Sequence, residues 1–397
     1  MQMKITVNDG TLSIELEGRI DASNAPEVEK EIMDAVEAYE ALIPEIDAKK
    51  LEYISSTGLR VLLRLSKRAG GKITVKNVSS QVYDIFEVTG FTEFLNVEKA
   101  LRFVSAKGLE KLGAGVHSTV YRLDDESIIK VVKDMSLEAI RDEMNVSKTA
   151  FIHGIPTAIS YDVVETEEGY GEIYEMFRAG VLSSEMKRFP EKKEYYLKRF
   201  VDMYRQIHEI DMSDSILKPA KDRYIEAVEQ ISEVLEREET DKLRSFIEAI
   251  PDKNTFVHGD FHMSNVMLQD GELLLIDVGE AGYGHQLFDF AQTRWALCVA
   301  TVWYPDRCER ILGIPLDTAS WIRDNIFREY YQENGESMER KQRVIDAMGI
   351  VRMLLIRYLQ GIKEMPDFPR RIEFAREHFF PYADELCEII KTDFKVR

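Results

Sequence analysis

One segment of the chain, residues 258–277, carries three side chains whose types and spacing suit the transfer of a phosphoryl group. Asp260 is a candidate base that could orient a hydroxyl group, and Asn265 supplies a carboxamide downstream of it. Asp277 follows two short apolar strands that are joined at Asp270-Gly271, a dipeptide typical of a two-residue hairpin turn.

The hairpin should bring the two oxygen-bearing side chains together at its open end. If the turn is centred on Asp270-Gly271, Asn265 faces Ile276 across the strands and lies beside Asp277. Carboxylate and carboxamide oxygens suit Mg²⁺. With Asp260 just upstream, this arrangement is what phosphoryl transfer from a nucleotide requires.

Two further features lie upstream, in residues 112–121 (LGAGVHSTVY) and 127–132 (SIIKVV). The first is a glycine-containing turn followed by a strand, although such glycines also close ordinary hairpins. The second places Lys130 in an apolar strand, where its charge is costly unless it is paired. Glu143, on a helix expected over about 136–152, is the best-placed partner, and Glu138 is the second candidate.

Residues from about 108 to the C-terminus resemble the aminoglycoside phosphotransferase and choline kinase group, which has the protein-kinase-like fold. The resemblance rests on several motifs that occur in the expected order along the chain, and not on any single motif. They are LGAGVHSTVY, IIKVV, the helix carrying Glu143 before HGIP, HGDFHMSN, IDVGE and GHQLFDFA.

This resemblance implies roles for the five residues already singled out. Asp260 would be the catalytic base, while Lys130 would hold the α- and β-phosphates and Glu143 would fix Lys130. Asn265 and Asp277 would be the Mg²⁺ ligands. ATP is the expected phosphate donor, with GTP as the alternative.

The resemblance also implies where the nucleotide would lie. Gly113, Gly115 and Ser118 would form the turn that covers its phosphates. The adenine would bond to the backbone of a hinge at residues 174–177, and Glu175 and Phe177 are the residues expected to contact it.

A metallohydrolase is a rival interpretation of the central motif, because His258 and His262 lie close to Asp260. Gly259 disfavours a regular helix there, and no further His-rich segment supplies the remaining ligands. We therefore expect His258 to be structural, with its ring bonded to the backbone of the catalytic loop. The family resemblance implies that Asp289 braces the same loop.

The first hundred residues have a different pattern, in which strands alternate with helices. Such alternation predicts a small sheet covered by helices. Strands are expected over about 3–7, 12–16, 42–47 and 72–78, and helices over about 25–39, 59–69 and 80–89.

Three motifs in this region, GRIDASNAPEVE, YISSTGLRVLLRL and VYDIFEVTGF, resemble a STAS domain, the fold of anti-sigma-factor antagonists. The resemblance implies that Ser56 is a phosphorylated regulatory switch. A helix N-terminus beside Ser56 would stabilise a phosphate. The alternative is that Ser55, Ser56 and Thr57 are ordinary capping residues, and Ser55 stands where many antagonists carry aspartate.

The expected fold class is therefore a multidomain α+β chain. Residues 1–103 form the STAS-like domain, and residues 108–397 form a bilobal kinase-like domain, with a β-rich N-lobe over about 108–178 and a mainly helical C-lobe over about 179–397. C-lobe helices are expected over about 191–208, 224–250, 286–303, 318–333, 338–362 and 368–391. Nothing local identifies the phosphate acceptor.

Composition limits the partners. The net charge of −19 argues against nucleic acid and permits a cationic substrate. Three cysteines without a spaced pair, no signal peptide and no long apolar run predict a cytoplasmic protein without a membrane partner.

The sequence thus predicts an ATP- and Mg²⁺-dependent phosphotransferase that acts on a hydroxyl group of a small molecule. Its STAS domain would regulate it or dock a protein partner. Two alternatives stay open. The kinase-like domain could phosphorylate a protein, including Ser56, or it could be a non-catalytic scaffold that binds nucleotide.

Overall fold

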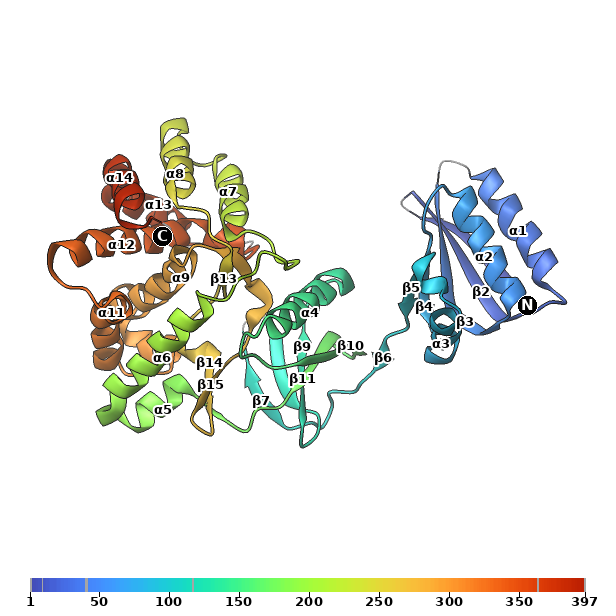
Figure 1. Ribbon diagram of the computed structural model, residues 1–397, viewed down its shortest axis with the longest axis horizontal. Coiled ribbons are helices and arrows are strands. Elements are labelled where there is room, and N and C mark those ends of the chain that lie inside the picture. The colour runs from blue at the N-terminus through green and yellow to red at the C-terminus, as the bar shows by residue number, and fades with distance from the viewer. Residues whose placement is uncertain (1, 9, 40–41, 116–117, 363, 396–397) are drawn as a thin grey trace. The chain divides into compact units, whose positions relative to one another are not determined.

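The computed structural model divides the chain into two compact units, Met1–Val104 and Ser105–Arg397 (Figure 1). It describes residues 2–8, 10–39, 42–115, 118–362 and 364–395. Each unit has its own hydrophobic core.

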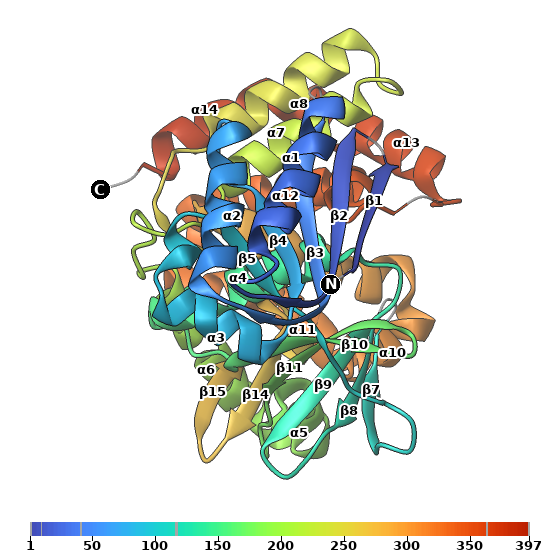
Figure 2. The same cartoon turned by 90° about the vertical axis from the view of Figure 1, so that its right-hand side faces the viewer.

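The first unit is a five-stranded sheet in the order β1-β2-β3-β4-β5. Strands β1 and β2 are antiparallel, whereas β2, β3, β4 and β5 pair in parallel. Helices α1 and α2 pack against each other and against the sheet, and Figure 2 views the unit from their side. The elements are β1 (Gln2–Asn8), β2 (Thr11–Ile20), α1 (Ala25–Ala38), β3 (Ile43–Ile54), α2 (Ser56–Arg68), β4 (Thr74–Val78), α3 (Ser80–Val88), η1 (Phe91–Glu93), β5 (Asn96–Lys99) and β6 (Arg102–Phe103).

Alternating burial explains the sheet of this unit. Leu12, Ile14 and Leu16 in β2 are fully buried, as period-2 alternation requires of a strand with one face on the core. Strand β3 is longer than the predicted 42–47, because a register shift against β2 lets it continue past the exposed Lys49-Lys50 to the buried Ile54. The helix after it begins at Ser56, earlier than the predicted residue 59.

The second unit begins with a sheet-rich part. Its antiparallel strands have the order β10-β11-β9-β8-β7, and α4 packs against β10 and β11. Ile129 and Val131 of β9 are buried, which leaves Lys130 between them on the other face. The elements are β7 (Lys111–Ala114), β8 (Ser118–Arg122), β9 (Ser127–Val132), α4 (Leu137–Ile152), β10 (Ser160–Thr166), β11 (Gly169–Glu175) and β12 (Gly180–Val181).

The rest of the second unit is mainly helical. Strand β14 pairs antiparallel with both β12 and β15, and β13 pairs antiparallel with β16. Its helices are α5 (Leu182–Arg188), α6 (Lys193–Ile207), α7 (Ala220–Ile231), α8 (Arg237–Ala249), α9 (Leu287–Cys298), α10 (Cys308–Leu312), α11 (Leu316–Tyr331), α12 (Gly335–Leu359), α13 (Phe368–His378) and α14 (Ala383–Asp393). Its strands are β13 (Thr255–Val257), β14 (Val266–Gln269), β15 (Glu272–Leu275) and β16 (Gly282–Gly284). Its short 3₁₀ helices are η2 (Pro190–Lys192), η3 (Met263–Asn265), η4 (Val278–Glu280), η6 (Pro305–Arg307) and η7 (Phe380–Tyr382), and η5 (Val299–Trp303) is a π-helix.

Two of the long predicted helices are wrong, because each is interrupted. The stretch 224–250 divides into α7 and α8, since Glu236 and Glu239 form a capping box that starts a new helix. The stretch 368–391 divides into α13 and α14 around η7, where Pro381 lacks the amide proton that a continuous helix needs.

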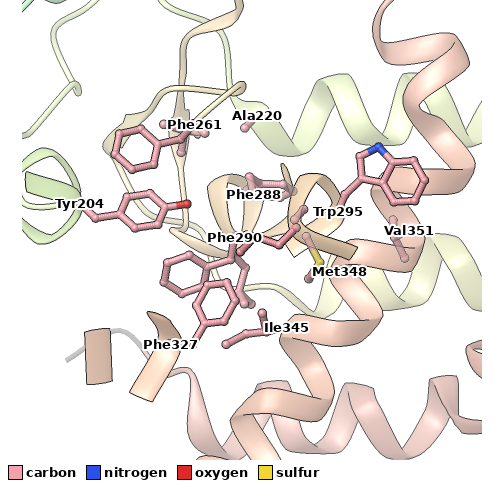
Figure 3. Close-up of a cluster of buried hydrophobic side chains, with 14 of the residues drawn as sticks. Tyr204, Ala220, Phe261, Phe288, Phe290, Trp295, Phe327, Ile345, Met348 and Val351 are labelled. Atoms are coloured by element: carbon pink, nitrogen blue, oxygen red, sulfur yellow. The ribbon is translucent and has the colours of Figure 1, made fainter. Parts of the chain in front are cut away.

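Aromatic side chains pack beneath the segment that follows β13 (Figure 3). The rings of Tyr204 and Phe261 are stacked with centroids 4.0 Å apart, and Phe290 meets Tyr204 edge-on. The Tyr204 hydroxyl lies 2.7 Å from Thr293 Oγ1, which donates to the carbonyl of Phe261. Packing therefore fixes the residue next to Asp260.

Among the helices of the described residues, none combines the length and the apolar character that a membrane-spanning helix needs.

Candidate active site

The hairpin that carries Asn265 and Asp277 has the predicted register. Val266 pairs with Leu275, and the amide of Ile276 donates to the carbonyl of Asn265 at 3.0 Å. Asp270 and Gly271 at its turn both have positive φ, 51° and 86°, as a type I′ turn requires. The local turn chemistry thus places Asn265 at the open end of the hairpin, next to the residue that precedes Asp277.

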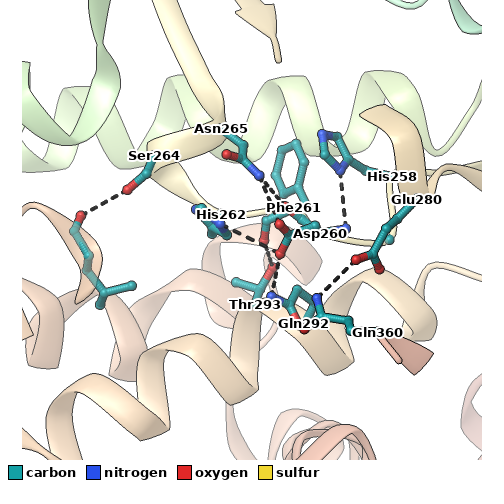
Figure 4. A network of polar contacts seen from close by, with 12 residues as sticks. His258, Asp260, Phe261, His262, Ser264, Asn265, Glu280, Gln292, Thr293 and Gln360 are labelled. Carbon is teal, nitrogen blue, oxygen red and sulfur yellow. Dashed lines mark hydrogen bonds and ion pairs between the residues drawn. The ribbon is translucent and has the colours of Figure 1, made fainter. Parts of the chain in front are cut away.

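Both carboxylate oxygens of Asp260 accept a hydrogen bond from a side-chain amide (Figure 4). Asn265 Nδ2 donates to Oδ2 at 3.2 Å and to the Asp260 carbonyl at 2.9 Å. Gln292 Nε2 donates to Oδ1 at 2.5 Å, and His262 Nε2 lies 3.6 Å from the same oxygen.

The surroundings of Asp260 favour its ionised form. Burial alone would raise the pKa of this carboxyl, but the contact with His262 and the electrostatic interactions with His262, His258 and Arg352 outweigh burial and lower the pKa to about 2. Asp260 is therefore a carboxylate at any physiological pH, ready to accept a hydrogen bond from a hydroxyl group.

Lys130 is held by two carboxylates, one from each side of the second unit. Its Nζ lies 2.6 Å from Glu143 Oε1 in α4 and 2.7 Å from Asp277 Oδ1. Burial opposes the charge, but Asp277 and Glu143 more than compensate and raise the pKa of Lys130 above its usual value. Of the two partners predicted for Lys130, Glu143 makes the contact, while Glu138 lies in the first turn of α4.

Asn265 and Asp277 fit a divalent cation by the chemistry of their free oxygens. Because the Asn265 amide nitrogen is engaged by Asp260, its Oδ1 remains as a donor to a hard cation. The side chain of Asp277 is half exposed, and its backbone has φ 61° and ψ 51°. Such a left-handed conformation is uncommon for residues other than glycine and points to a functional position.

His258 and Asp289 brace the loop that carries Asp260, as predicted. His258 Nε2 lies 3.2 Å from the carbonyl of Ile276, and its Nδ1 accepts from the Asp260 amide at 3.2 Å. Asp289 accepts from the amides of His258 and Gly259 at 2.9 and 2.8 Å. With both ring nitrogens bonded to backbone, His258 is not a metal ligand. Among the described residues, no group of three or more His, Cys, Asp or Glu side chains could hold a metal ion.

Two glycines allow the close approach of the loops around the site. Gly259 has φ 84°, and a Cβ there would lie 2.5 Å from the carbonyl oxygen of Glu280. A Cβ at Gly279 would lie 2.6 Å from Cγ of Glu143. Glycine at these positions lets the loop after Asp277 pack against both Glu143 and the catalytic loop.

The residues predicted to contact the nucleotide lie in the sheet-rich part. Gly113 lies in β7, and the Gly115 amide donates to the Ser118 carbonyl at 2.9 Å. Val116 and His117 of the same turn lie outside the described residues. The predicted roles of Gly113, Gly115 and Ser118 toward a nucleotide stay predictions.

The hinge expected at residues 174–177 begins within β11, whose last residue is Glu175. Its Glu175 amide donates to the Ile159 carbonyl at 2.9 Å, and the Met176 amide donates to the Glu126 carbonyl at 2.8 Å. These bonds hold the backbone that leads into Phe177. Contact of Glu175 and Phe177 with an adenine stays a prediction.

In the first unit, Ser56 is the first residue of α2 and is exposed. Ser55 is the N-cap, and its hydroxyl accepts from the Gly58 amide at 3.3 Å. The capping role thus belongs to Ser55, which leaves the Ser56 hydroxyl at the start of the helix.

Sequence reasoning missed Gln292, Arg352 and Glu280. Arg352 Nε donates to Gln292 Oε1 at 2.8 Å, and Arg352 Nη2 lies 3.4 Å from Glu280 Oε2. A signal for Arg352 is present in the sequence: one arginine stands in the apolar run of residues 348–356, where its charge must be paired.

Comparison with known proteins identifies both parts of the chain. Residues 108–314 match the model of the phosphotransferase enzyme family. The chain belongs to that family. Residues 2–103 match the STAS domain model, so this phosphotransferase carries an N-terminal STAS domain ahead of a sheet-rich N-lobe and a helical C-lobe, as predicted.

Relatives of the STAS domain are anti-sigma factor antagonists by name. BtrV of Bordetella bronchiseptica is 31% identical over 109 residues, which are 26% of this chain and 93% of that protein. An anti-sigma-B factor antagonist of Listeria monocytogenes is 28% identical over 90 residues, which are 22% of this chain and 78% of that protein.

Solved structures similar to this phosphotransferase include a choline/ethanolamine kinase family protein from Mesorhizobium loti. It is 16% identical, with a TM-score of 0.46, and the match covers 72% of this chain and 93% of that one. The ADP-bound aminoglycoside phosphotransferase APH(2'')-Ib is also 16% identical, with a TM-score of 0.42, and the match covers 73% of this chain and 95% of that one.

Proposed function

We propose that this phosphotransferase moves the γ-phosphate of a nucleotide to a hydroxyl group of a small molecule. The donor is ATP, with GTP as the alternative, and the reaction depends on Mg²⁺. The single observation that carries the proposal is the ion pair between Lys130 and Asp277, 2.7 Å long, which joins strand β9 to the loop after the catalytic hairpin.

That ion pair supports the proposal because it brings together groups with complementary tasks. A buried ammonium suits the phosphates of a nucleotide, and Glu143 keeps Lys130 in place from α4. Asn265 and Asp277 would hold Mg²⁺, which would neutralise charge on the phosphates when it is bound. Catalysis of this type consists mostly of positioning and electrostatic stabilisation.

Asp260 would orient the acceptor. In the transfer, the bond between the γ-phosphorus and its bridging oxygen breaks, and a new phosphorus–oxygen bond forms to the acceptor hydroxyl. Asp260 accepts the hydrogen bond of that hydroxyl and receives its proton as the new bond forms. The carboxylate form that this task requires agrees with the lowered pKa of Asp260.

The STAS domain would regulate the enzyme or dock a protein partner. Support comes from its relatives, which are named as anti-sigma factor antagonists. A second candidate function follows from the exposed position of Ser56 at the first residue of α2: the kinase-like domain could phosphorylate this serine. A helix N-terminus stabilises a phosphate by its free amides and its positive potential.

Calorimetry tests the nucleotide site directly. Titration of the full chain with ATP and Mg²⁺ should release or absorb heat with one site per chain, and Lys130→Met should weaken the binding. Absence of any binding heat in the wild type would contradict the proposal.

A further inference from the structure

We infer that Gln292 positions the carboxylate of Asp260, and that Arg352 sets the orientation of the Gln292 amide. This inference rests on the proposed role of Asp260. It adds two residues that act through the base rather than on the substrate, from helices α9 and α12.

Hydrogen bonds connect the side chains of Asp260, Gln292 and Arg352 in series. Gln292 Nε2 donates to Asp260 Oδ1 at 2.5 Å, and Arg352 Nε donates to Gln292 Oε1 at 2.8 Å. Gln292 is 7% exposed and Arg352 is 2% exposed, so water has little access to either contact. Burial makes such hydrogen bonds costly to leave unmade.

The orientation of the Gln292 amide follows from the chemistry of its two neighbours. A guanidinium can only donate hydrogen bonds, so the amide oxygen must face Arg352. The amide NH₂ must then face Asp260, which as a carboxylate can only accept. A flipped amide would set donor against donor and acceptor against acceptor, and the arginine therefore selects one orientation.

Arg352 is itself held in place from its other side. Its Nη2 lies 3.4 Å from Glu280 Oε2, and Glu280 Oε1 accepts from Gln360 Nε2 at 3.0 Å. Arg223 Nη2 lies 3.4 Å from Glu280 as well. The chain of contacts thus runs from the loop after Asp277 through α12 and α9 to the base.

The consequence for Asp260 is a fixed carboxylate plane. Gln292 holds Oδ1, while Asn265 holds Oδ2 at 3.2 Å. Without Gln292, Oδ1 would keep only the longer contact with His262, at 3.6 Å, and the carboxylate could turn about its Cβ–Cγ bond. Because phosphoryl transfer depends on the alignment of the acceptor, loss of Gln292 should lower turnover without weakening the nucleotide site.

The test uses ADP release from Mg-ATP with water as the acceptor, which needs no knowledge of the natural substrate. Gln292→Met removes the hydrogen bond without adding a charge. Gln292→Glu keeps the shape and adds a carboxyl group beside Asp260. The matched control is Gln342→Glu in α12, because Gln342 Nε2 also donates to an aspartate, Asp346, at 2.7 Å.

Both Gln292 variants should lower kcat and leave the KM for ATP unchanged. Gln292→Met should lower kcat about ten- to a hundred-fold, because the carboxylate of Asp260 loses one of its two amide donors. Gln292→Glu should lower kcat at least as far, because it keeps the shape of the side chain but sets an acceptor against the acceptor of Asp260.

The split between kcat and KM separates positioning from a merely structural role. Gln342→Glu should leave both kcat and the KM for ATP at their wild-type values. A merely structural role for Gln292 would lower the yield or stability of the variants and would weaken ATP binding together with turnover.

Wild-type kcat in Gln292→Met or in Gln292→Glu would overturn the inference and leave the proposed function intact. A wild-type chain that releases no ADP under any condition would instead contradict the proposed function, before any variant is made. Calorimetry of ATP binding to each variant confirms that the folded site is being compared.

Discussion

At the scale of single residues, the central feature is a carboxylate that cannot be protonated under ordinary conditions. The pKa of Asp260 is lowered to about 2, so its carboxylate is present above that pH and is lost only as the pH falls through about 2. Such a group is a weak base. In the proposed transfer, Asp260 would therefore mainly align the acceptor, and it would receive the proton only as the new bond forms.

Asp260→Asn should lower kcat by about two to four orders of magnitude, because the amide cannot receive the acceptor's proton. Nucleotide affinity should be nearly unchanged, since Lys130 and Asp277 keep their contact. Calorimetry and steady-state ADP release measure the two quantities separately. Asp270→Asn is the matched control, because asparagine suits the positive φ of the hairpin turn. Near-normal turnover in Asp260→Asn would remove the base from the account.

Residues that belong to local motifs could be predicted, and residues joined across the chain could not. The hairpin register that positions Asn265 follows from Asp270-Gly271, and the need to pair Lys130 follows from its apolar strand. Gln292 and Arg352 are 60 residues apart. No local pattern says that an amide in α9 meets a guanidinium in α12, because that contact depends on how the helices pack.

At the scale of elements, strand β11 carries a buried carboxyl group. This strand pairs with β9 and packs against α4. Glu172 is 1% exposed and faces Lys130 across the strands. Its Oε1 accepts from Ser160 Oγ at 2.6 Å, while Oε2 has no hydrogen-bond partner among the described residues. Burial raises the pKa of Glu172 to about 7, with a smaller contribution from the charge of Glu143.

Because the folded protein holds this proton more tightly than the unfolded chain, the stabilising contribution of Glu172 is complete below the ordinary pKa of the carboxyl. It is lost as the pH rises through about 7. The loss should be on the order of 3 kcal/mol. Urea unfolding of Glu172→Gln should therefore show a flatter dependence of stability on pH than the wild type. Glu165→Gln, at an exposed position of neighbouring β10, is the control. Parallel pH dependences in wild type and Glu172→Gln would contradict this expectation.

The ends of helices and strands could be predicted where capping residues and hydrophobic periodicity agree. The predictions failed where these two signals compete. Hydrophobic spacing continues from α7 into α8, yet the capping box at Glu236 and Glu239 divides them. Conversely, the sequence predicts that the strand ends at about residue 47, whereas a register shift lets β3 stay paired with β2 as far as Ile54. In both cases hydrogen bonding of the backbone, rather than side-chain hydrophobicity, decides where the element ends.

At the scale of the whole molecule, a STAS domain and a phosphotransferase domain share one chain, which poses the question of whether the enzyme phosphorylates its own STAS domain. We expect a small-molecule acceptor. Incubation of the full chain with γ-labelled ATP should therefore leave Ser56 unlabelled, and Ser56→Ala should behave as the wild type does. Label in the chain that disappears in Ser56→Ala would instead support the signalling alternative.

The net charge of −19 bears on the acceptor. An acidic protein attracts cationic ligands, and this attraction is weakened by salt. If the acceptor is an amine, its KM should rise with ionic strength, whereas the KM of a neutral sugar should not. Steady-state kinetics at low and high salt distinguish the two classes.

The most direct test of the central claim is ADP release from Mg-ATP across a panel of amino sugars, choline-like amines, amino alcohols and sugars, with phosphorylation of the acceptor followed by mass spectrometry. We expect at least one of these hydroxyl compounds to raise ADP release above the rate with water and to gain one phosphate, in the wild type but not in Asp260→Asn. Phosphate transfer that is equal in Asp260→Asn and wild type would contradict the account.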